Sequence, residues 1–415
     1  MSRISKWCSG LLLTGFLCVA ISLSDVAVAQ GLMTEATYNR LERVYGLMDE
    51  ERFTDALEAA RSARDRARND HERAVIAQVL GFIHINMENY RDALDQFLAA
   101  LEVEDALPVN PTLNIKANVA QLYGQFEEWE RAIEYVDRYI DLVEKSEDRD
   151  HAPSRIYLVG AQAYMQMERW REALPYLLKA IEYDDEPREG HYRALLSIYF
   201  ELNEYENAVD ALETMLGYWP DNMNYWFQMF SLQVELGNDQ EALSVLKLAH
   251  RKGLFDSETH YVNLYRMYML EGAPYKAGQV MEDGIQAGDI PRNEQRVDMM
   301  SRAWIQAQEY DLAIGSLEML SEIKGDGTAD LTIAQLEQER ANWDGAFEAA
   351  NRAYERGGLD DPGRALLLAG RAAAERKDYD QALAVFERAM DYDESREQAG
   401  QWVNYIEEER AILGN

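Results

Sequence analysis

Residues 81–100 read Gly-Phe-Ile-His-Ile-Asn-Met-Glu-Asn-Tyr-Arg-Asp-Ala-Leu-Asp-Gln-Phe-Leu-Ala-Ala, and this stretch decides the fold. One apolar stripe of helical spacing begins just before this stretch and continues into its first half, at Ala77, Leu80, Gly81 and His84. A second stripe occupies its second half, at Ala93, Phe97 and Ala100. The polar turn between them is short, so we expect two antiparallel helices. Such a pair buries its apolar faces only when neighbouring pairs flank it.

Side-chain sizes in this stretch indicate how the pair packs. Gly81 and Ala93 are small, and we expect them where the two helix axes approach most closely. Tyr90 and Phe97 are large, and we expect them to fill the space between this pair and the next. His84 stands at a core position and is expected to be a histidine with satisfied hydrogen bonds.

The pattern recurs along the chain at intervals of 33 to 41 residues. The place of Ala93 is filled in turn by Ala56, Ala93, Ala132, Ala173, Ala208, Ala242, Ala277, Ala313, Ala346 and Ala382. An aromatic residue stands three positions before most of them, as Tyr90 does before Ala93. These residues are therefore expected to form the core and not a cofactor site.

This spacing resembles the tetratricopeptide repeat (TPR) over about residues 38–395. The resemblance implies an all-α fold, a TPR α-solenoid or superhelix of about ten antiparallel helix pairs. We expect the solenoid to occupy residues 30–394 and a C-terminal capping helix to occupy residues 395–415. The aromatic residues of that last helix, Trp402 and Tyr405, are expected to be core.

The first thirty residues have the order of a secretory signal peptide. Arg3 and Lys6 precede an apolar run over residues 11–23, and Ala27-Val28-Ala29 follows. We expect cleavage after Ala29 and a periplasmic mature protein. The alternatives are a membrane anchor and a buried helix, but the apolar run is short for a membrane span. No later stretch is apolar enough to predict an integral membrane protein.

The chain is strongly acidic, with a formal charge of −34 at pH 7 that becomes −35 when residues 1–29 are removed. Such a charge disfavours nucleic acid and anionic lipid as partners. It is typical of a solvated protein surface, and it also favours attraction to a basic partner. The 47% of hydrophobic residues is enough for a large core.

Catalytic and metal-binding motifs are absent from the sequence, so we expect no enzyme, no cofactor and no metal site. The two cysteines, Cys8 and Cys18, lie in the expected signal peptide. The six histidines are scattered, and no two have the spacing of metal ligands on a helix. A protein or peptide is the expected partner.

The resemblance to TPR proteins also implies where that partner would bind, because the first helices of the pairs line a concave groove in that family. Three positions around the small residue of each first helix face inward in such a groove. They place seven polar residues as candidate partner contacts: Gln121, Gln162, Arg193, Ser197, Arg266, Arg302 and Arg371. Arginine suits carboxylates and backbone oxygens as ligands. The alternative is that each arginine pairs with a neighbouring glutamate.

Several short stretches give a narrower resemblance, among them residues 103–108, 273–277, 356–359 and 401–407. Together they resemble the secreted TPR proteins associated with TonB–ExbB–ExbD systems of Gram-negative bacteria. The resemblance implies a periplasmic accessory scaffold for TonB-dependent uptake, with a basic TonB-like component as a possible partner. A general scaffold for assembly of the cell envelope is the alternative function, serving outer-membrane protein, polysaccharide or peptidoglycan machinery.

Overall fold

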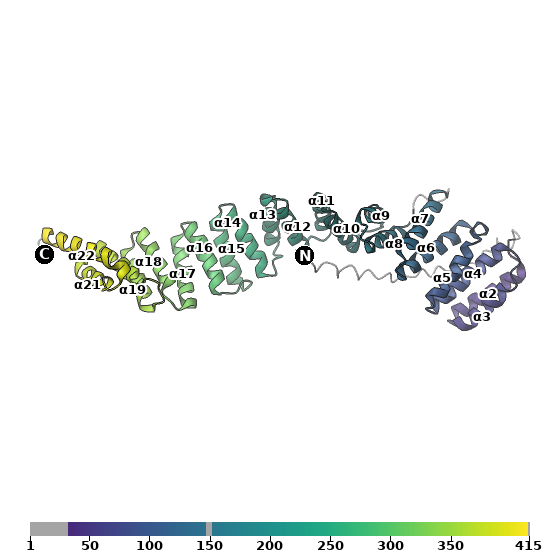
Figure 1. Ribbon diagram of the computed structural model, residues 1–415, viewed down its shortest axis with the longest axis horizontal. Coiled ribbons are helices and arrows are strands. Elements are labelled where there is room, and N and C mark those ends of the chain that lie inside the picture. The colour runs from purple at the N-terminus through teal and green to yellow at the C-terminus, as the bar shows by residue number, and fades with distance from the viewer. Residues whose placement is uncertain (1–31, 147–151, 414–415) are drawn as a thin grey trace. The chain divides into compact units, whose positions relative to one another are not determined.

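The computed structural model describes residues 32–146 and 152–413, and within these ranges the chain forms 21 α-helices and no strand (Figure 1). The expected signal peptide lies outside the described residues. Twenty of the helices form ten consecutive pairs, and one helix follows. The predicted all-α solenoid is therefore confirmed. No helix in the described part of the chain is both long and apolar enough to cross a membrane.

The chain divides into two compact units, and the first ends at Tyr218. It contains five helix pairs: α2 (Glu35–Asp49) with α3 (Phe53–Arg64), α4 (Asp70–Asn86) with α5 (Tyr90–Leu101), α6 (Val109–Gln125) with α7 (Trp129–Glu144), α8 (Ser154–Gln166) with α9 (Trp170–Glu182), and α10 (Glu189–Leu202) with α11 (Tyr205–Tyr218). One 3₁₀ turn, η2 (Glu104–Ala106), precedes α6. Within this unit, the second helix of each of the first four pairs contacts the first helix of the next pair.

The second unit begins at Trp219. Its pairs are α12 (Met223–Glu235) with α13 (Asp239–Arg251), α14 (Glu258–Leu270) with α15 (Pro274–Ala287), α16 (Glu294–Gln306) with α17 (Tyr310–Lys324), α18 (Thr328–Glu339) with α19 (Trp343–Arg356), and α20 (Pro362–Glu375) with α21 (Tyr379–Ala389). The last helix, α22 (Asp393–Leu413), begins two residues before the expected start and packs on α20 and α21.

The repeated alanines form the core of every pair. All ten, from Ala56 to Ala382, have no solvent-exposed surface. A methyl group lets the backbones of neighbouring helices approach, and larger side chains then close over it. The alanine register read from the sequence is therefore correct in each pair. This includes the pairs around Ala242 and Ala277, where no aromatic residue stands three positions before the alanine.

Gly81 shows why a small residue is needed at the first-helix position. A Cβ atom built on Gly81 would lie 2.5 Å from Cε1 of Phe97, well inside contact distance. Phe97 is fully buried, and its ring meets Phe82 edge-on with 5.2 Å between centroids. The expectation that Phe97 lies between pairs is thus incomplete, because its ring covers Gly81 of its own pair. Gly370 meets Phe386 in the same way.

All ten turns within the pairs share one backbone feature. Each has a residue in the left-handed region, with φ between 56° and 74°, and only Gly237 and Gly272 among these ten residues are glycines. At Glu88 the turn closes through a hydrogen bond of 2.9 Å from the amide of Asn89 to the carbonyl of His84. This bond satisfies a carbonyl at the end of the first helix, as in a Schellman motif. The turn therefore repeats in conformation and not in sequence.

Buried charges are bound to polar neighbours and serve the packing. Asp330, which is 2% exposed, accepts hydrogen bonds from Ser321 (2.6 Å), Arg352 (3.1 Å) and Arg356 (2.9 Å). The carboxylate thereby joins α17, α18 and α19. A buried ion with several donors avoids the cost of a bare charge in the core, so we assign this cluster a structural role.

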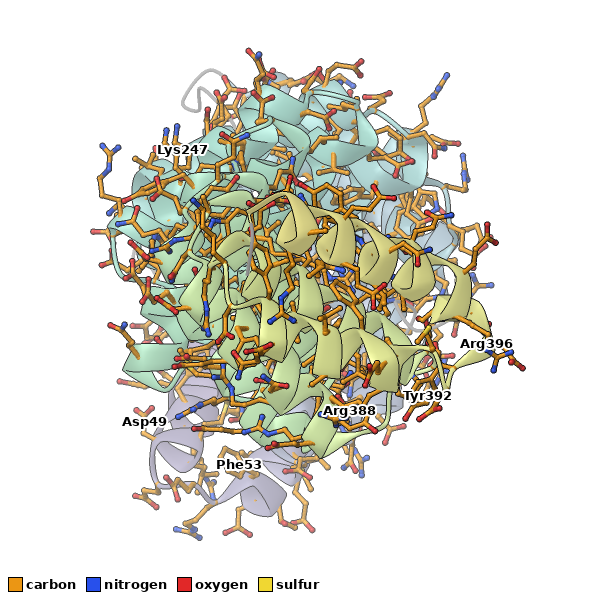
Figure 2. All side chains as sticks on the ribbon, turned by 90° about the vertical axis from the view of Figure 1, so that its left-hand side faces the viewer. Asp49, Phe53, Lys247, Arg388, Tyr392 and Arg396 are labelled. Carbon is orange, nitrogen blue, oxygen red and sulfur yellow. The ribbon has the colours of Figure 1, made fainter. Side chains whose placement is uncertain are left out.

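Tyr354 on α19 contacts α21 and the turn that follows α21 in the C-terminal unit. The hydroxyls of Tyr354 and Tyr392 are 3.1 Å apart, and the guanidinium of Arg388 lies 4.9 Å from the Tyr354 ring centroid. Figure 2 shows Arg388 and Tyr392 next to each other at the edge of this unit, with Arg396 pointing outward. A cation–π contact such as that of Arg388 with the Tyr354 ring is worth about 0.5–1 kcal/mol at an exposed site.

Candidate functional site

The polar positions predicted for the N-terminal unit lie on three of its first helices. Gln121 on α6, Gln162 on α8 and Ser197 on α10 are partly exposed, and Arg193 on α10 is exposed. Helices α6 and α8 touch each other, which places two successive first helices side by side. Arg193 and Ser197 are four residues apart and therefore share one face of α10. These residues can contact a partner, and Phe200, 39% exposed, lies next to Ser197 on that face.

The three predicted arginines of the C-terminal unit are all exposed, on α14, α16 and α20. Arg302 forms an ion pair of 2.8 Å with Asp298 on its own helix. The internal-pairing alternative therefore holds for Arg302, although with an aspartate and not a glutamate. Arg266 and Arg371 have no carboxylate within 4.0 Å among the described residues. These two guanidinium groups remain open to a partner.

Other arginines of this unit link consecutive pairs. Each stands at or near the end of a first helix or of α22 and binds the aspartate at the second position of the preceding helix: Arg340 with Asp311 at 2.6 Å, Arg376 with Asp344 at 2.9 Å and Arg410 with Asp380 at 2.8 Å. The aspartates are 83–88% exposed, so solvent screens these ion pairs and they contribute little to stability. The pairs nevertheless fix where these arginine side chains point.

His84 is buried as expected, but its hydrogen bonds are not satisfied. Its Nδ1 atom has no hydrogen-bond partner in the structure, and the nearest carboxylate, that of Asp92, is 3.8 Å away. Burial lowers the pKa of His84, and the charge of Asp92 opposes this only in part. The expectation of a satisfied core histidine is therefore wrong for Nδ1.

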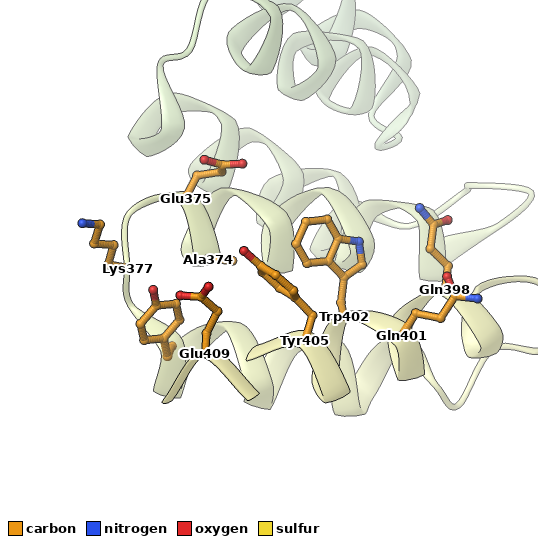
Figure 3. Close-up of a pocket in the computed structure, with 9 residues that line it drawn as sticks. Ala374, Glu375, Lys377, Gln398, Gln401, Trp402, Tyr405 and Glu409 are labelled. Atoms are coloured by element: carbon orange, nitrogen blue, oxygen red, sulfur yellow. The ribbon is translucent and has the colours of Figure 1, made fainter. Parts of the chain in front are cut away.

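A pocket between α20 and α22 was not predicted from the sequence (Figure 3). Its volume is about 580 Å³. One side is formed by the end of α20, the turn that follows it and the start of α21, with Ala374, Glu375, Lys377 and Tyr379. The other side is formed by α22, with Gln398, Gln401, Trp402, Tyr405 and Glu409. Arg371 lies one helical turn before Glu375 on α20.

The aromatic residues of α22 line this pocket. Trp402 stacks on Phe386 with 5.7 Å between ring centroids and an interplanar angle of 4°. Tyr405 stands edge-on to Trp402 at 5.7 Å and is 52% exposed. The expectation that both belong to the core is thus wrong for Tyr405 and holds only for the Trp402 face that covers Phe386.

Within residues 32–146 and 152–413, no three His, Cys, Asp or Glu side chains stand close enough together to hold a metal ion. The pocket offers two carboxylates, one ammonium group and three aromatic rings with hydrogen-bonding groups. This arrangement can bind a charged side chain and has no evident nucleophile–base pair.

Comparison with known proteins identifies the repeat. A family model of the tetratricopeptide repeat matches residues 158–222 and 331–398, one segment reaching from the first unit into the second and one within the second. These two segments therefore match the tetratricopeptide repeat, and such repeats suggest a protein-binding scaffold with a protein or peptide as the class of partner. No curated protein matches the chain.

Three solved structures illustrate the similarity. A tetratricopeptide repeat protein from Parabacteroides merdae is 13% identical, with 65% of this chain and 99% of that chain covered and a TM-score of 0.37. Naa15/Naa10 bound to HypK-THB is 16% identical, with 92% of this chain and 62% of that chain covered and a TM-score of 0.41. YrrB, a TPR protein with an unusual peptide-binding site, is 19% identical, with 47% and 98% covered and a TM-score of 0.32.

Proposed function

We propose that this chain is a non-enzymatic periplasmic scaffold that binds a protein partner and assists a TonB-dependent uptake system. The observation that carries the binding role is the open state of Arg266 and Arg371. Both are exposed on first helices and have no carboxylate within 4.0 Å among the described residues, whereas Arg302, Arg340 and Arg376 of the same unit form ion pairs. A guanidinium fork held on a rigid helix suits the carbonyl or carboxylate oxygens of an extended segment.

The location rests on the sequence. Arg3 and Lys6, the apolar run and the Ala-x-Ala site give residues 1–29 the order of a signal peptide, and cleavage after Ala29 would leave a chain without cysteine. Such a chain suits an oxidising compartment, because it has no thiol to be oxidised. Purification from a periplasmic fraction with Gln30 as the first residue would support this location. Recovery from the cytoplasm with residues 1–29 retained would contradict it.

The TonB assignment rests on the short resemblances and on charge. Residues 401–407, one of the stretches that carry the resemblance, supply three side chains of the pocket: Gln401, Trp402 and Tyr405. The formal charge of −34 favours a basic partner and speeds its encounter with the protein. TonB-like components rich in proline and lysine have the required charge.

The test is affinity capture from periplasmic and detergent-solubilised envelope extracts, with the tagged full-length chain as bait. We expect a TonB, ExbB or ExbD component at low and moderate salt. The variant pair R266Q/R371Q should reduce its recovery several-fold, whereas R396Q, which alters an arginine paired with Asp393 on its own helix, should not. Equal melting temperatures would exclude a loss of folding. Capture of outer-membrane assembly proteins without any TonB component would favour the general envelope scaffold instead.

A further inference from the structure

We infer that the pocket between α20 and α22 is a receptor for a lysine or arginine side chain of a basic partner segment. This inference rests on the proposed scaffold function and adds the chemistry of one contact. The pocket lies wholly within the C-terminal unit, and Figure 3 shows Trp402 and Tyr405 side by side on α22 with Glu375 across from them and Glu409 beside Tyr405.

The aromatic side of the pocket, formed by Trp402 and Tyr405, is held in place by contacts within the fold. Trp402 is held flat against the fully buried ring of Phe386, so its orientation is set by the core. Tyr405 is held edge-on to Trp402 and leaves half of its surface exposed. An exposed tyrosine beside a tryptophan in a concave site offers ring faces and a hydroxyl to an incoming group. Rings of this kind attract cations through their negative faces.

The two carboxylates of the pocket are among those that the fold leaves without an ion pair. Their sequence neighbours are engaged, because Arg376 binds Asp344 and Arg410 binds Asp380. Glu375 and Glu409, by contrast, have no cation within 4.0 Å in the described part of the chain. Even Arg371, four residues before Glu375 on α20, makes no ion pair with it. Two carboxylates and three aromatic rings thus line a space that a side chain can enter.

The charges around the pocket favour a positively charged side chain as its occupant. Lys377 also lines the pocket, so the site carries two negative charges and one positive charge. The remaining negative charge has the same sign as the whole protein, at −34. A basic side chain would be attracted by both, whereas an acidic one would be repelled by the protein field and by two of the three charged groups.

The closing experiment uses the full chain and three fluorescein-labelled decapeptides that alternate glycine with arginine, lysine or glutamate. Binding is measured by fluorescence anisotropy at about 20 and 150 mM salt, because screening weakens charge attraction at the higher concentration. We expect the arginine and lysine peptides to bind and the glutamate peptide not to bind. The double variant E375Q/E409Q should weaken binding about tenfold, and Y405A should weaken it several-fold.

Two controls separate the pocket from the acidic surface in general. E348Q removes an exposed carboxylate on α19 outside the pocket and should leave affinity unchanged. K377E should strengthen binding of the basic peptides, because it removes the one opposing charge. Equal effects of E348Q and E375Q/E409Q would overturn the inference. Binding of the glutamate peptide that K377E weakens would also overturn the inference, because it would show that the pocket binds an acidic side chain.

Failure of the inference is distinguishable from failure of the scaffold function. If the captured partner is retained by E375Q/E409Q and Y405A, the pocket assignment is wrong and the scaffold role stands. If the basic peptides bind through the pocket but no envelope protein is captured, the scaffold role fails and the pocket remains. Dimerisation in sedimentation velocity that Y405A abolishes would show that a second copy occupies the pocket, and it would also overturn the inference.

Discussion

Gly81→Ala tests the packing argument at the position where it is sharpest. The new methyl group would lie 2.5, 2.6 and 2.9 Å from three ring atoms of Phe97. The ring cannot move into solvent, because Phe97 is fully buried and Phe82 stands against it. Overpacking of this kind costs about 1–3 kcal/mol. Alanine gains about 1 kcal/mol of helix propensity over glycine, so we expect a net loss of about 1 kcal/mol.

Gly46→Ala is the matched control. Gly46 lies in α2 of the same unit, is exposed, and would present its new methyl group to open space, with no atom within 4 Å of it. It should therefore gain about 0.5–1 kcal/mol from propensity alone. Urea unfolding followed by circular dichroism gives the overall change. Hydrogen exchange of α4 and α5 amides shows whether the loss is local, as expected of a solenoid. Equal stability of the two variants would refute the close-approach explanation.

Two further predictions concern one buried carboxylate and one strained turn. Burial opposes ionisation of Glu72, but hydrogen bonds from the amides of Thr34 and Arg68 and from the Thr34 hydroxyl outweigh it and hold the pKa of Glu72 below its ordinary value. The contribution of the Glu72 carboxylate to the free energy of unfolding is therefore complete above the ordinary carboxyl pKa of about 4.5 and is lost as the pH falls below it. The urea midpoint of Glu72→Gln, measured between about pH 3 and 7, should therefore fall less steeply with acid than that of the wild type. Ala341→Gly should raise the free energy of unfolding by about 0.5–1 kcal/mol, because Ala341 has a φ of 57°. The control Ala384→Gly, within helix α21, should lower it. A lower free energy of unfolding in both variants would show that the turn is not strained.

The core was predictable because its signal is periodic. Ala56 to Ala382 recur at helix-pair spacing, and the need for a small residue at each close approach made them recognisable without a structure. The turns could not be predicted in the same way. A left-handed residue is usually marked by glycine or asparagine, yet Glu88, Ala341 and Lys377 fill that place here. Packing of the two helices imposes the conformation there, and local sequence does not record it.

The pocket was not predictable because the length of α22 creates it. Periodicity places Trp402 and Tyr405 on one side of a helix and suggests that this side is buried. It cannot say how far the neighbouring helices extend. Helix α22 has 21 residues, whereas α20 has 14 and α21 has 11. The preceding pair is too short to cover the whole of α22, so Tyr405 remains exposed beside Trp402.

The arginines show the same limit of sequence reasoning. Arg302 and Arg371 occupy equivalent places in their repeats, and the repeat pattern does not separate them, yet Arg302 has Asp298 one turn earlier as a partner. Arg371 has Glu375 one turn later, which is the less favourable order for an i,i+4 pair on a helix, and no ion pair forms. One face of α20 therefore presents an open cation next to an open anion. A basic partner drawn in by the acidic exterior would still need an acceptor group, such as a backbone carbonyl, for Arg371. Long-range attraction and recognition would thus depend on different residues, which is how an acidic scaffold can select among the many basic chains that its charge attracts.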